Sequence, residues 1–153
     1  MNIREPTTAA EWETYFDLRW RVLRAPWQQP RGSERDAQDS TASHCLIQDN
    51  DKRAIAIGRL HFNSPAEAQI RFMAVAPEYE GQGLGRTVLA ELERRARQAG
   101  ASRIVLNARD SALAFYRKHG FQVVGPAHSL FGSITHTRME KQIGDNKIGV
   151  AND

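Results

Sequence analysis

An apolar, strand-like run that breaks into a glycine loop and then a helix is the feature that most constrains this chain. The run ends in Met73–Pro77, glycines follow at Gly81, Gly83 and Gly85, and an amphipathic helix is expected from about Arg86. Glycine lets a backbone approach a ligand closely, and the first N–H groups of a helix have no partner within the helix. The stretch therefore predicts an anion cradle for a ligand that carries a pyrophosphate.

The glycine loop has three other interpretations. It is not a P-loop, because no Lys-Ser/Thr pair follows it. A dinucleotide fold needs an acidic residue about 20 positions later, where Ser102 and Arg103 stand here. A plain strand–helix turn without a ligand is the third interpretation, and the loop alone does not exclude it.

Bulk properties exclude several classes of protein. The 153 residues fit one domain, and a net charge of +3 spread among acidic residues does not favour nucleic-acid binding. Cys45 is the single cysteine, so an intrachain disulfide is impossible and a reducing compartment fits best. No run approaches the ~20 apolar residues of a membrane span. We therefore expect a soluble, cytoplasmic protein without a membrane partner.

The first half of the chain predicts a helix followed by antiparallel strands. Thr8 with Glu11 is a capping-box signature, and the apolar spacing after it suits a helix to about Leu23. The polar stretch 28–43 is expected to be a lid or poorly ordered. The expected strands are 3–4, 45–47, 54–62 and 68–75.

The second half predicts alternating helices and strands. A helix from Arg86 is expected to end before Gly100, and a second helix runs from Asp110 or Ser111 to His119. The expected strands are 104–106, 121–124 (ended by Gly125-Pro126) and 134–143, and residues 144–153 are expected to be a disordered tail.

A second motif follows the glycine loop by one helix and one strand. The spacing of Ala112, Phe115, Tyr116, Gly120 and Phe121 matches A-x-x-F-Y-x-x-x-G-F. Together with the loop, this motif resembles the GNAT superfamily of acyl-CoA N-acyltransferases. The resemblance implies an α+β (mixed α/β) GNAT fold over residues 1–143 as a single domain. It implies a mostly antiparallel sheet of about seven strands, splayed between the fourth and fifth, with about four flanking helices.

The N-terminal segments add a finer resemblance. Residues 18–24, 29–36 and 70–75 look like the acetyltransferase-type module that precedes a hot-dog, thioesterase-like domain in some bacterial proteins.

The resemblance implies acetyl-CoA as cosubstrate, with no metal. The fourth strand would pair with the pantetheine arm, an N–H near Ala74 or Val75 would polarise the acyl carbonyl, and the loop amides would hold the pyrophosphate. The cofactor-binding residues implied are Met73, Ala74, Val75, Gly81, Gln82, Gly83, Leu84, Gly85, Arg86, Arg109 and Phe115.

Two catalytic residues are implied. Tyr116 matches the family's usual general acid, which donates its proton to the departing thiolate, and its alternative is a core aromatic residue. His136 is the candidate base because its pKa range suits that role near neutrality, and its alternative is a half-exposed strand histidine. Gln69 occupies a position where some members carry a glutamate base, and an amide cannot accept that proton.

Two positions depart from the cofactor pattern of the family. Glu80 stands where the loop normally begins with Gln or Arg, so we expect its carboxylate to point outward and Arg86 or Arg109 to supply positive charge. Arg109 replaces a frequent asparagine, which removes the usual polar contact there.

The acceptor side is the least defined part of the site. Arg71, Gln69 and Arg31 are the candidate substrate contacts, and Arg71 on a central strand needs a carboxylate partner, internal or in the substrate. Arg71 is expected on the same face as Gln69 and Met73. The segment 31–36 either contacts the acceptor or is a surface loop held by mutual ion pairs.

The resemblance implies transfer of an acetyl group from acetyl-CoA to a small-molecule or peptide primary amine. Two other activities stay open: decarboxylation of a malonyl thioester on CoA or acyl carrier protein, and a non-catalytic CoA-binding module. Dimerisation is frequent in this family, so a homodimer is compatible with the sequence.

Overall fold

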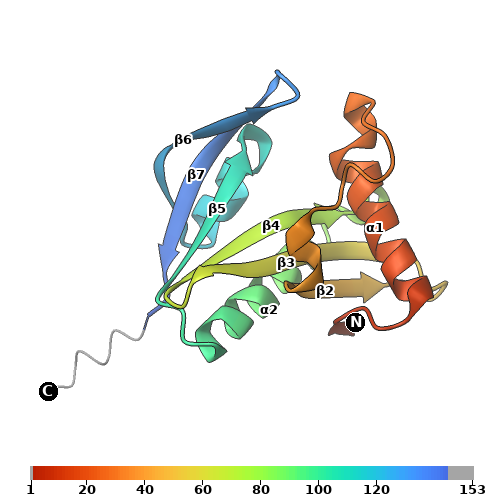
Figure 1. Ribbon diagram of the computed structural model, residues 1–153, viewed down its shortest axis with the longest axis horizontal. Coiled ribbons are helices and arrows are strands. Elements are labelled where there is room, and N and C mark those ends of the chain that lie inside the picture. The colour runs from red at the N-terminus through yellow and green to blue at the C-terminus, as the bar shows by residue number, and fades with distance from the viewer. Residues whose placement is uncertain (1, 145–153) are drawn as a thin grey trace, which may run out of the picture. The chain divides into compact units, whose positions relative to one another are not determined.

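The computed structural model describes residues 2–144, so the predicted tail at 145–153 lies outside the described residues. Within 2–144 there are three α-helices and seven strands (Figure 1). The chain forms two compact units: residues up to 61 with 70–95, and residues 62–69 with those from 96 onward. The strands are β1 Ile3–Arg4, β2 Ser43–Gln48, β3 Ala54–Ser64, β4 Glu67–Val75, β5 Arg103–Arg109, β6 Gln122–Leu130 and β7 Ile134–Gln142. The helices are α1 Ala9–Leu23, α2 Leu84–Gln98 and α3 Leu113–Lys118, with short 3-10 segments at Ala25–Trp27, Ala37–Ser40 (η2), Pro77–Tyr79 and Asp110–Ala112.

The first helix begins where its sequence predicts. The Thr8 side chain accepts from the Glu11 N–H at 3.1 Å, and the Glu11 carboxylate accepts from the Thr8 N–H at 3.2 Å. This reciprocal cap satisfies N–H groups that the first helical turn leaves without partners. Tyr15 and Leu18 then lie on the buried face of α1. The predicted capping box and helix are confirmed.

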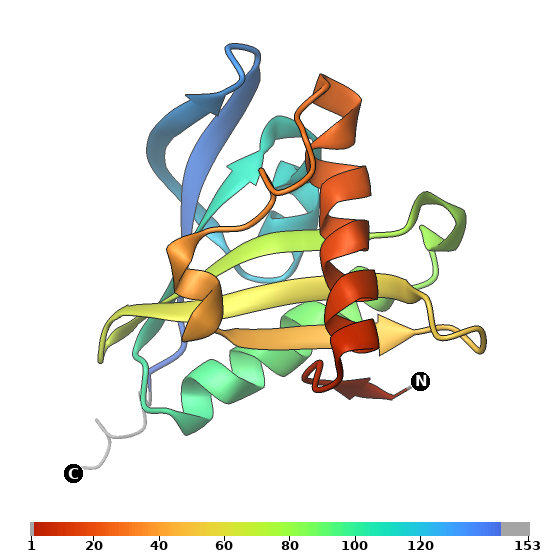
Figure 2. The same cartoon turned by 45° about the vertical axis from the view of Figure 1, so that its right-hand side comes forward.

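The first unit holds a sheet with a helix on each face. β1 and β2 are antiparallel, as are β2 and β3, and β4 lies next to β3. Helix α1 crosses one face of these strands and α2 covers the other (Figures 1 and 2). A Cβ on Gly58 of β3 would lie 2.7 Å from Val88 and 2.9 Å from Leu92, so glycine at this position permits close packing of α2.

The segment 28–43 is a structured part of the first unit, so the alternative of a poorly ordered stretch is wrong. It contains the 3-10 segment η2, capped by Asp36, whose carboxylate accepts from the Gln38 N–H at 3.0 Å. Asp36 and Asp39 also bind the guanidinium of Arg59 on β3. The segment carries no apolar period because ion pairs with the sheet, rather than buried hydrocarbon, hold it in place.

The second unit is built around β5. Residues Glu67–Gln69 of β4 pair in parallel with Arg103–Val105, while β7 pairs antiparallel with both β5 and β6. Pairing between β4 and β5 stops at Gln69, which confirms the predicted mixed sheet that splays between the fourth and fifth strands. Buried Ile104, Leu106 and Met139 form part of this unit's core.

Two other expectations about the elements are wrong. Strand β6 does not stop at Gly125-Pro126 but continues to Leu130, with irregular register on both sides of Pro126. Proline is tolerated there because β6 is the edge strand and needs no N–H donor on its open side. The number of α-helices in residues 2–144 is three rather than about four, because the segment after α1 forms only 3-10 turns.

No helix in the described part of the chain combines the length and the apolar character that crossing a bilayer requires.

Candidate functional site

Strand β4 has an abrupt change of backbone direction at Phe72. Its φ of +58° lies in the left-handed region, which a bulky residue in a strand rarely adopts. Regular alternation of side chains therefore breaks between Arg71 and Met73. Arg71 lies over the Phe72 ring, 4.4 Å from its centroid, whereas the Met73 sulfur lies 3.5 Å from where a Cβ on Gly58 would be, on the α2 face. The prediction that Arg71 shares a face with Met73 is wrong for this reason.

Residues 73–75 of β4, which are expected to pair with the pantetheine arm, follow this change of direction. Ala74 is buried, and Met73 and Val75 are partly exposed. The strand ends as the Ala76 N–H donates to the Ile55 carbonyl of β3 at 2.8 Å. Among residues 2–144, β5 pairs only with the first three residues of β4, so the strand next to 73–75 in that range is β3.

The glycine loop has the geometry of an anion cradle. Gly81 and Gly83 both have φ of +81°, and neither has a neighbour within 3.4 Å of where a Cβ would stand. Helix α2 begins at Leu84, two residues before the position that the sequence predicts. The first helical N–H to find a carbonyl is that of Thr87, which donates to Gly83 at 3.1 Å. The amides of residues 83–86 thus remain available at the start of a 15-residue helix.

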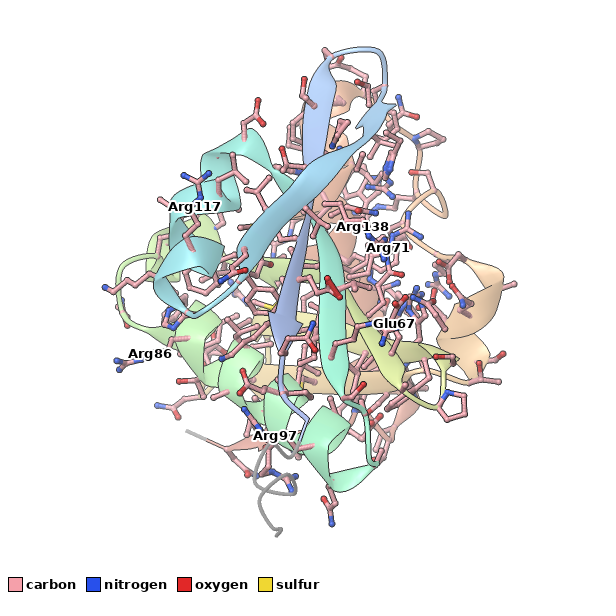
Figure 3. All side chains as sticks on the ribbon, turned by 90° about the vertical axis from the view of Figure 1, so that its left-hand side faces the viewer. Glu67, Arg71, Arg86, Arg97, Arg117 and Arg138 are labelled. Atoms are coloured by element: carbon pink, nitrogen blue, oxygen red, sulfur yellow. The ribbon has the colours of Figure 1, made fainter. Side chains whose placement is uncertain are left out.

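Charged side chains flank the glycine loop. Glu80 and Gln82 are exposed, so the carboxylate of Glu80 is free to stay in solvent. Arg86 is exposed, and its Nη2 lies 3.7 Å from the position a Cβ on Gly83 would take. Figure 3 shows Arg86 projecting from the start of its helix. Open amides, left-handed glycines and one adjacent cation fit a pyrophosphate group.

Arg71 has the internal carboxylate partner that a strand arginine was expected to need. Its Nη1 donates to Asp36 Oδ2 at 3.1 Å, and 41% of its side chain is exposed.

Gln69 and Arg31, the other two candidate substrate contacts, have protein partners. The Gln69 side-chain oxygen accepts from Asn63 Nδ2 at 2.9 Å in the second unit. Arg31 donates to Asp17 at 2.9 Å and stacks over Trp20, with its guanidinium carbon 4.0 Å from the ring centroid. Ion pairs therefore hold much of the 31–36 segment, as expected for a surface loop.

A groove of about 600 Å³ lies between α1 and this segment in the first unit. It is lined by Ala10, Glu13, Thr14, Phe16, Asp17, Arg31, Gly32, Glu34 and Arg35.

Tyr116 lies on α3 in the second unit. Its side chain is 8% exposed and packs edge-on against Phe115 and Phe121, at centroid distances of 5.1 and 5.7 Å. Within residues 2–144 its hydroxyl has no hydrogen-bonding partner. The hydroxyl oxygen is not one of the fully buried polar atoms that lack a partner. Burial raises the pKa of the phenol, so the proton stays on the oxygen at neutral pH.

His136 lies on β7, directly opposite Arg109 at the end of β5. It is 7% exposed rather than half-exposed, and its Nδ1 lies 3.1 Å from the Ile134 carbonyl. A carbonyl only accepts, so Nδ1 donates to Ile134, and the main chain of His128 is a second backbone partner of the ring. Burial, together with His128 and Arg109, lowers the pKa of His136 and keeps the ring neutral near pH 7. Burial also lowers the pKa of Arg109.

Two features of the site were not found from sequence. The ring of exposed His128 stacks on His136 with centroids 4.7 Å apart and planes 15° from parallel. This pair depends on an irregular register between β6 and β7 that no local pattern shows. Phe72 was the other omission, because only a non-glycine residue at positive φ marks it.

Among residues 2–144 no cluster of three or more histidine, cysteine or carboxylate side chains has the arrangement of a metal site.

Known proteins resemble this chain over most of its length. The model of the acetyltransferase (GNAT) family matches residues 12–121. The uncharacterized N-acetyltransferase YjcF of Bacillus subtilis (strain 168) is 28% identical over 126 residues, which is 82% of this chain and 89% of that protein.

Solved structures share the fold at low identity. A putative N-acetyltransferase from Lactobacillus plantarum superposes with a TM-score of 0.79 at 22% identity, covering 92% of this chain and 97% of that one. An aminoglycoside 6'-N-acetyltransferase complexed with coenzyme A gives a TM-score of 0.79 at 14% identity, covering 95% and 99%. With the family model spanning both the glycine loop and the Phe115-Tyr116 motif, the chain belongs to the acetyltransferase (GNAT) family.

Proposed function

We propose that this protein transfers the acetyl group of acetyl-CoA directly to a primary amine. The observation that carries the proposal is the set of open amides at residues 83–86, which follow two left-handed glycines and begin helix α2. Such a helix start binds phosphate through N–H groups and through the positive end of the helix dipole. The chain belongs to the GNAT family, which uses acetyl-CoA, and this supports coenzyme A as the ligand whose phosphate binds there.

The reaction balances as a single acyl transfer. The amine nitrogen attacks the thioester carbonyl carbon, a C–N bond forms, and the C–S bond then breaks. A main-chain N–H at Ala74 or Val75 stabilises the oxyanion. The departing sulfur takes a proton from the Tyr116 hydroxyl, and the proton lost by the amine goes to a base or to water.

Tyr116 suits the role of general acid because it holds its proton. Its raised pKa keeps the phenol neutral, and no protein group in residues 2–144 forms a hydrogen bond with its hydroxyl. Apolar surroundings also raise the proton affinity of a thiolate, so the same type of environment favours proton transfer to sulfur.

His136 is the base in this proposal. In this proposal the Nδ1–H donates to the Ile134 carbonyl and Nε2 takes the proton of the amine. Its lowered pKa leaves the ring unprotonated at neutral pH, as proton abstraction requires. On the acceptor side, Arg71, Gln69 and Arg31 remain the proposed contacts.

Decarboxylation of a malonyl thioester is the competing function. One observation favours it: Arg71 is a half-exposed cation that could hold the malonyl carboxylate. In that reaction the C–C bond breaks, carbon dioxide leaves, and the remaining carbanion takes a proton.

The deciding experiment is a thiol-release assay. With acetyl-CoA and a panel of primary amines, we expect free CoA to appear only when an amine is present. With malonyl-CoA and no amine, we expect no acetyl-CoA. Acetyl-CoA formed in the second reaction, without amine-dependent thiol in the first, would replace transfer by decarboxylation.

A further inference from the structure

The ring of Phe72 is surrounded by positive charge. Four guanidinium groups of the first unit lie within 6 Å of its centroid, a distance at which a cation is attracted to an aromatic face. Their carbons stand at 4.1 Å (Arg19), 4.4 Å (Arg71), 4.8 Å (Arg59) and 5.6 Å (Arg24). We call these four arginines with Phe72 the arginine cluster.

Two carboxylates enter the arginine cluster. Asp39 binds Arg19 at 3.0 Å and Arg59 at 2.9 Å, and Asp36 binds Arg59 and Arg71. Arg19, Arg59 and Arg71 thus share two carboxylates, which leaves one more positive than negative charge among these five side chains.

Neighbouring groups do not remove this excess. The Glu34 carboxylate is engaged by the Gly32 N–H at 2.8 Å and by Arg35 at 3.1 Å. The ring nitrogen Nδ1 of His61 lies 3.3 Å from Arg59 Nη2, and since a guanidinium only donates, this nitrogen is an acceptor. An uncompensated group of cations calls for an anion from outside the chain.

Only one member of the cluster is both exposed and short of partners. Arg19 and Arg59 have 0% exposed side chains, so an external ligand does not reach them. Arg71 is 41% exposed and uses one of its five N–H donors, on Asp36. Among residues 2–144 its other four donors have no hydrogen-bonding partner.

The guanidinium of Arg71 is nevertheless held in place. Asp36 Oδ2 fixes one edge, and the Phe72 ring lies beneath it. A planar guanidinium held in this way matches a carboxylate, which it binds through two parallel hydrogen bonds. Burial and the nearby cations Arg59 and Arg19 lower the pKa of Arg71, and a bound anion would offset both effects.

We propose that Arg71 binds a carboxylate of the acceptor, so that the acceptor is an amino acid or a similar small amine that carries a carboxylate. This rests on the proposed acetyl transfer, since the acceptor is the molecule that receives the acetyl group. The side chains of Arg71 and Met73 lie on different faces, but the main chain proposed to hold the thioester begins only two residues after Arg71 on β4, within the span of a small molecule.

The experiment compares amines that differ only in the carboxylate. Glycine, β-alanine and 4-aminobutyrate are each paired with their primary amide, and kcat/KM is expressed per concentration of free amine. We expect the wild-type protein to prefer the acid of at least one pair by tenfold or more. Arg71→Gln should lower kcat/KM for that acid 10- to 100-fold, mainly through KM, and leave the amide and acetyl-CoA within about twofold.

A matched control separates this effect from a general loss of charge. Arg21 is 39% exposed and pairs with Asp17 on α1, outside the arginine cluster. Arg21→Gln removes the same charge at a similar exposure and should leave the acid-to-amide ratio unchanged.

Other outcomes overturn the inference. Equal rates for acid and amide in the wild type, or a preference that survives in Arg71→Gln, would contradict it while leaving acetyl transfer intact. Acetyl-CoA formed from malonyl-CoA alone, and lost in Arg71→Gln, would assign the carboxylate to the acyl donor instead. If no amine is acetylated, the proposed function fails. In that case calorimetry measures the binding of each acid and of its primary amide to the CoA-loaded protein. Equal heats for acid and amide would contradict the inference.

Discussion

The buried guanidinium of Arg59 donates to Asp39 Oδ1 across 2.9 Å, which joins β3 to a 3-10 segment 20 positions earlier in the sequence. Asp39 also binds Arg19, whose side chain is equally buried. One carboxylate thus forms ion pairs with two guanidinium groups that have no access to solvent.

Asp39→Asn should therefore lower the free energy of unfolding by about 2–4 kcal/mol, because it leaves buried charge without its partner. Urea denaturation measures this value. The control is Asp17→Asn, which breaks two exposed pairs with Arg21 and Arg31 and should cost less than about 1 kcal/mol. Equal losses in the two variants would show that the buried pairs do not stabilise the fold more than surface pairs.

Phe72 offers a test of backbone strain. In an ordinary strand position alanine is more stabilising than glycine. At φ of +58° the order should reverse, because the left-handed region costs a residue with a Cβ about 1–2 kcal/mol. Both variants lose the ring, so Phe72→Gly should be more stable than Phe72→Ala by about 1 kcal/mol in thermal or urea unfolding. The usual order, with alanine more stable, would mean that β4 is not strained at this residue.

Tyr116→Phe should lower kcat by about 10²- to 10⁴-fold, the typical contribution of a general acid. The affinity for CoA should stay within about twofold, because the ring that packs against Phe115 and Phe121 is kept. Single-turnover thiol release and calorimetry measure the two quantities. Undiminished turnover would instead assign proton delivery to water.

The pH profile of kcat/KM should report His136. Because burial lowers its pKa, the ring loses its proton below the usual pKa of about 6.5, and activity should rise with pH through that lower value. His136→Gln should remove this acid limb and lower the plateau.

His128 adds a second test of the same limb. His128→Gln removes the Coulombic effect of the stacked ring, which lowers the pKa of His136, so that pKa should move up and the limb should shift to higher pH. An unchanged acid limb in His136→Gln would exclude His136 as the base.

Local rules explain why much of the fold was predictable. The Thr8–Glu11 cap and the glycines before α2 are short-range patterns, since each links residues a few positions apart. Buried Tyr116 and the loop amides follow from motifs whose spacing is visible in one stretch of sequence.

The unpredicted parts depend on contacts far apart in the chain. The choice of Asp36 as the partner of Arg71 joins residues 35 positions apart, and no periodicity records it. The extension of β6 through Pro126 depends on which strand forms the edge of the sheet. The stacking of His128 on His136 depends on where the register shifts.

The most direct test of the account is calorimetry of coenzyme A binding to the wild type and to Gly83→Ala. A Cβ at Gly83 meets no clash but forces alanine into φ of +81°, which should weaken CoA binding by about tenfold through the displaced amides. Gly100→Ala, at φ of +92° with nothing within 4 Å, imposes the same strain at the other end of α2 and should leave affinity unchanged. Absence of heat with coenzyme A, or equal affinities in all three proteins, would contradict the cradle.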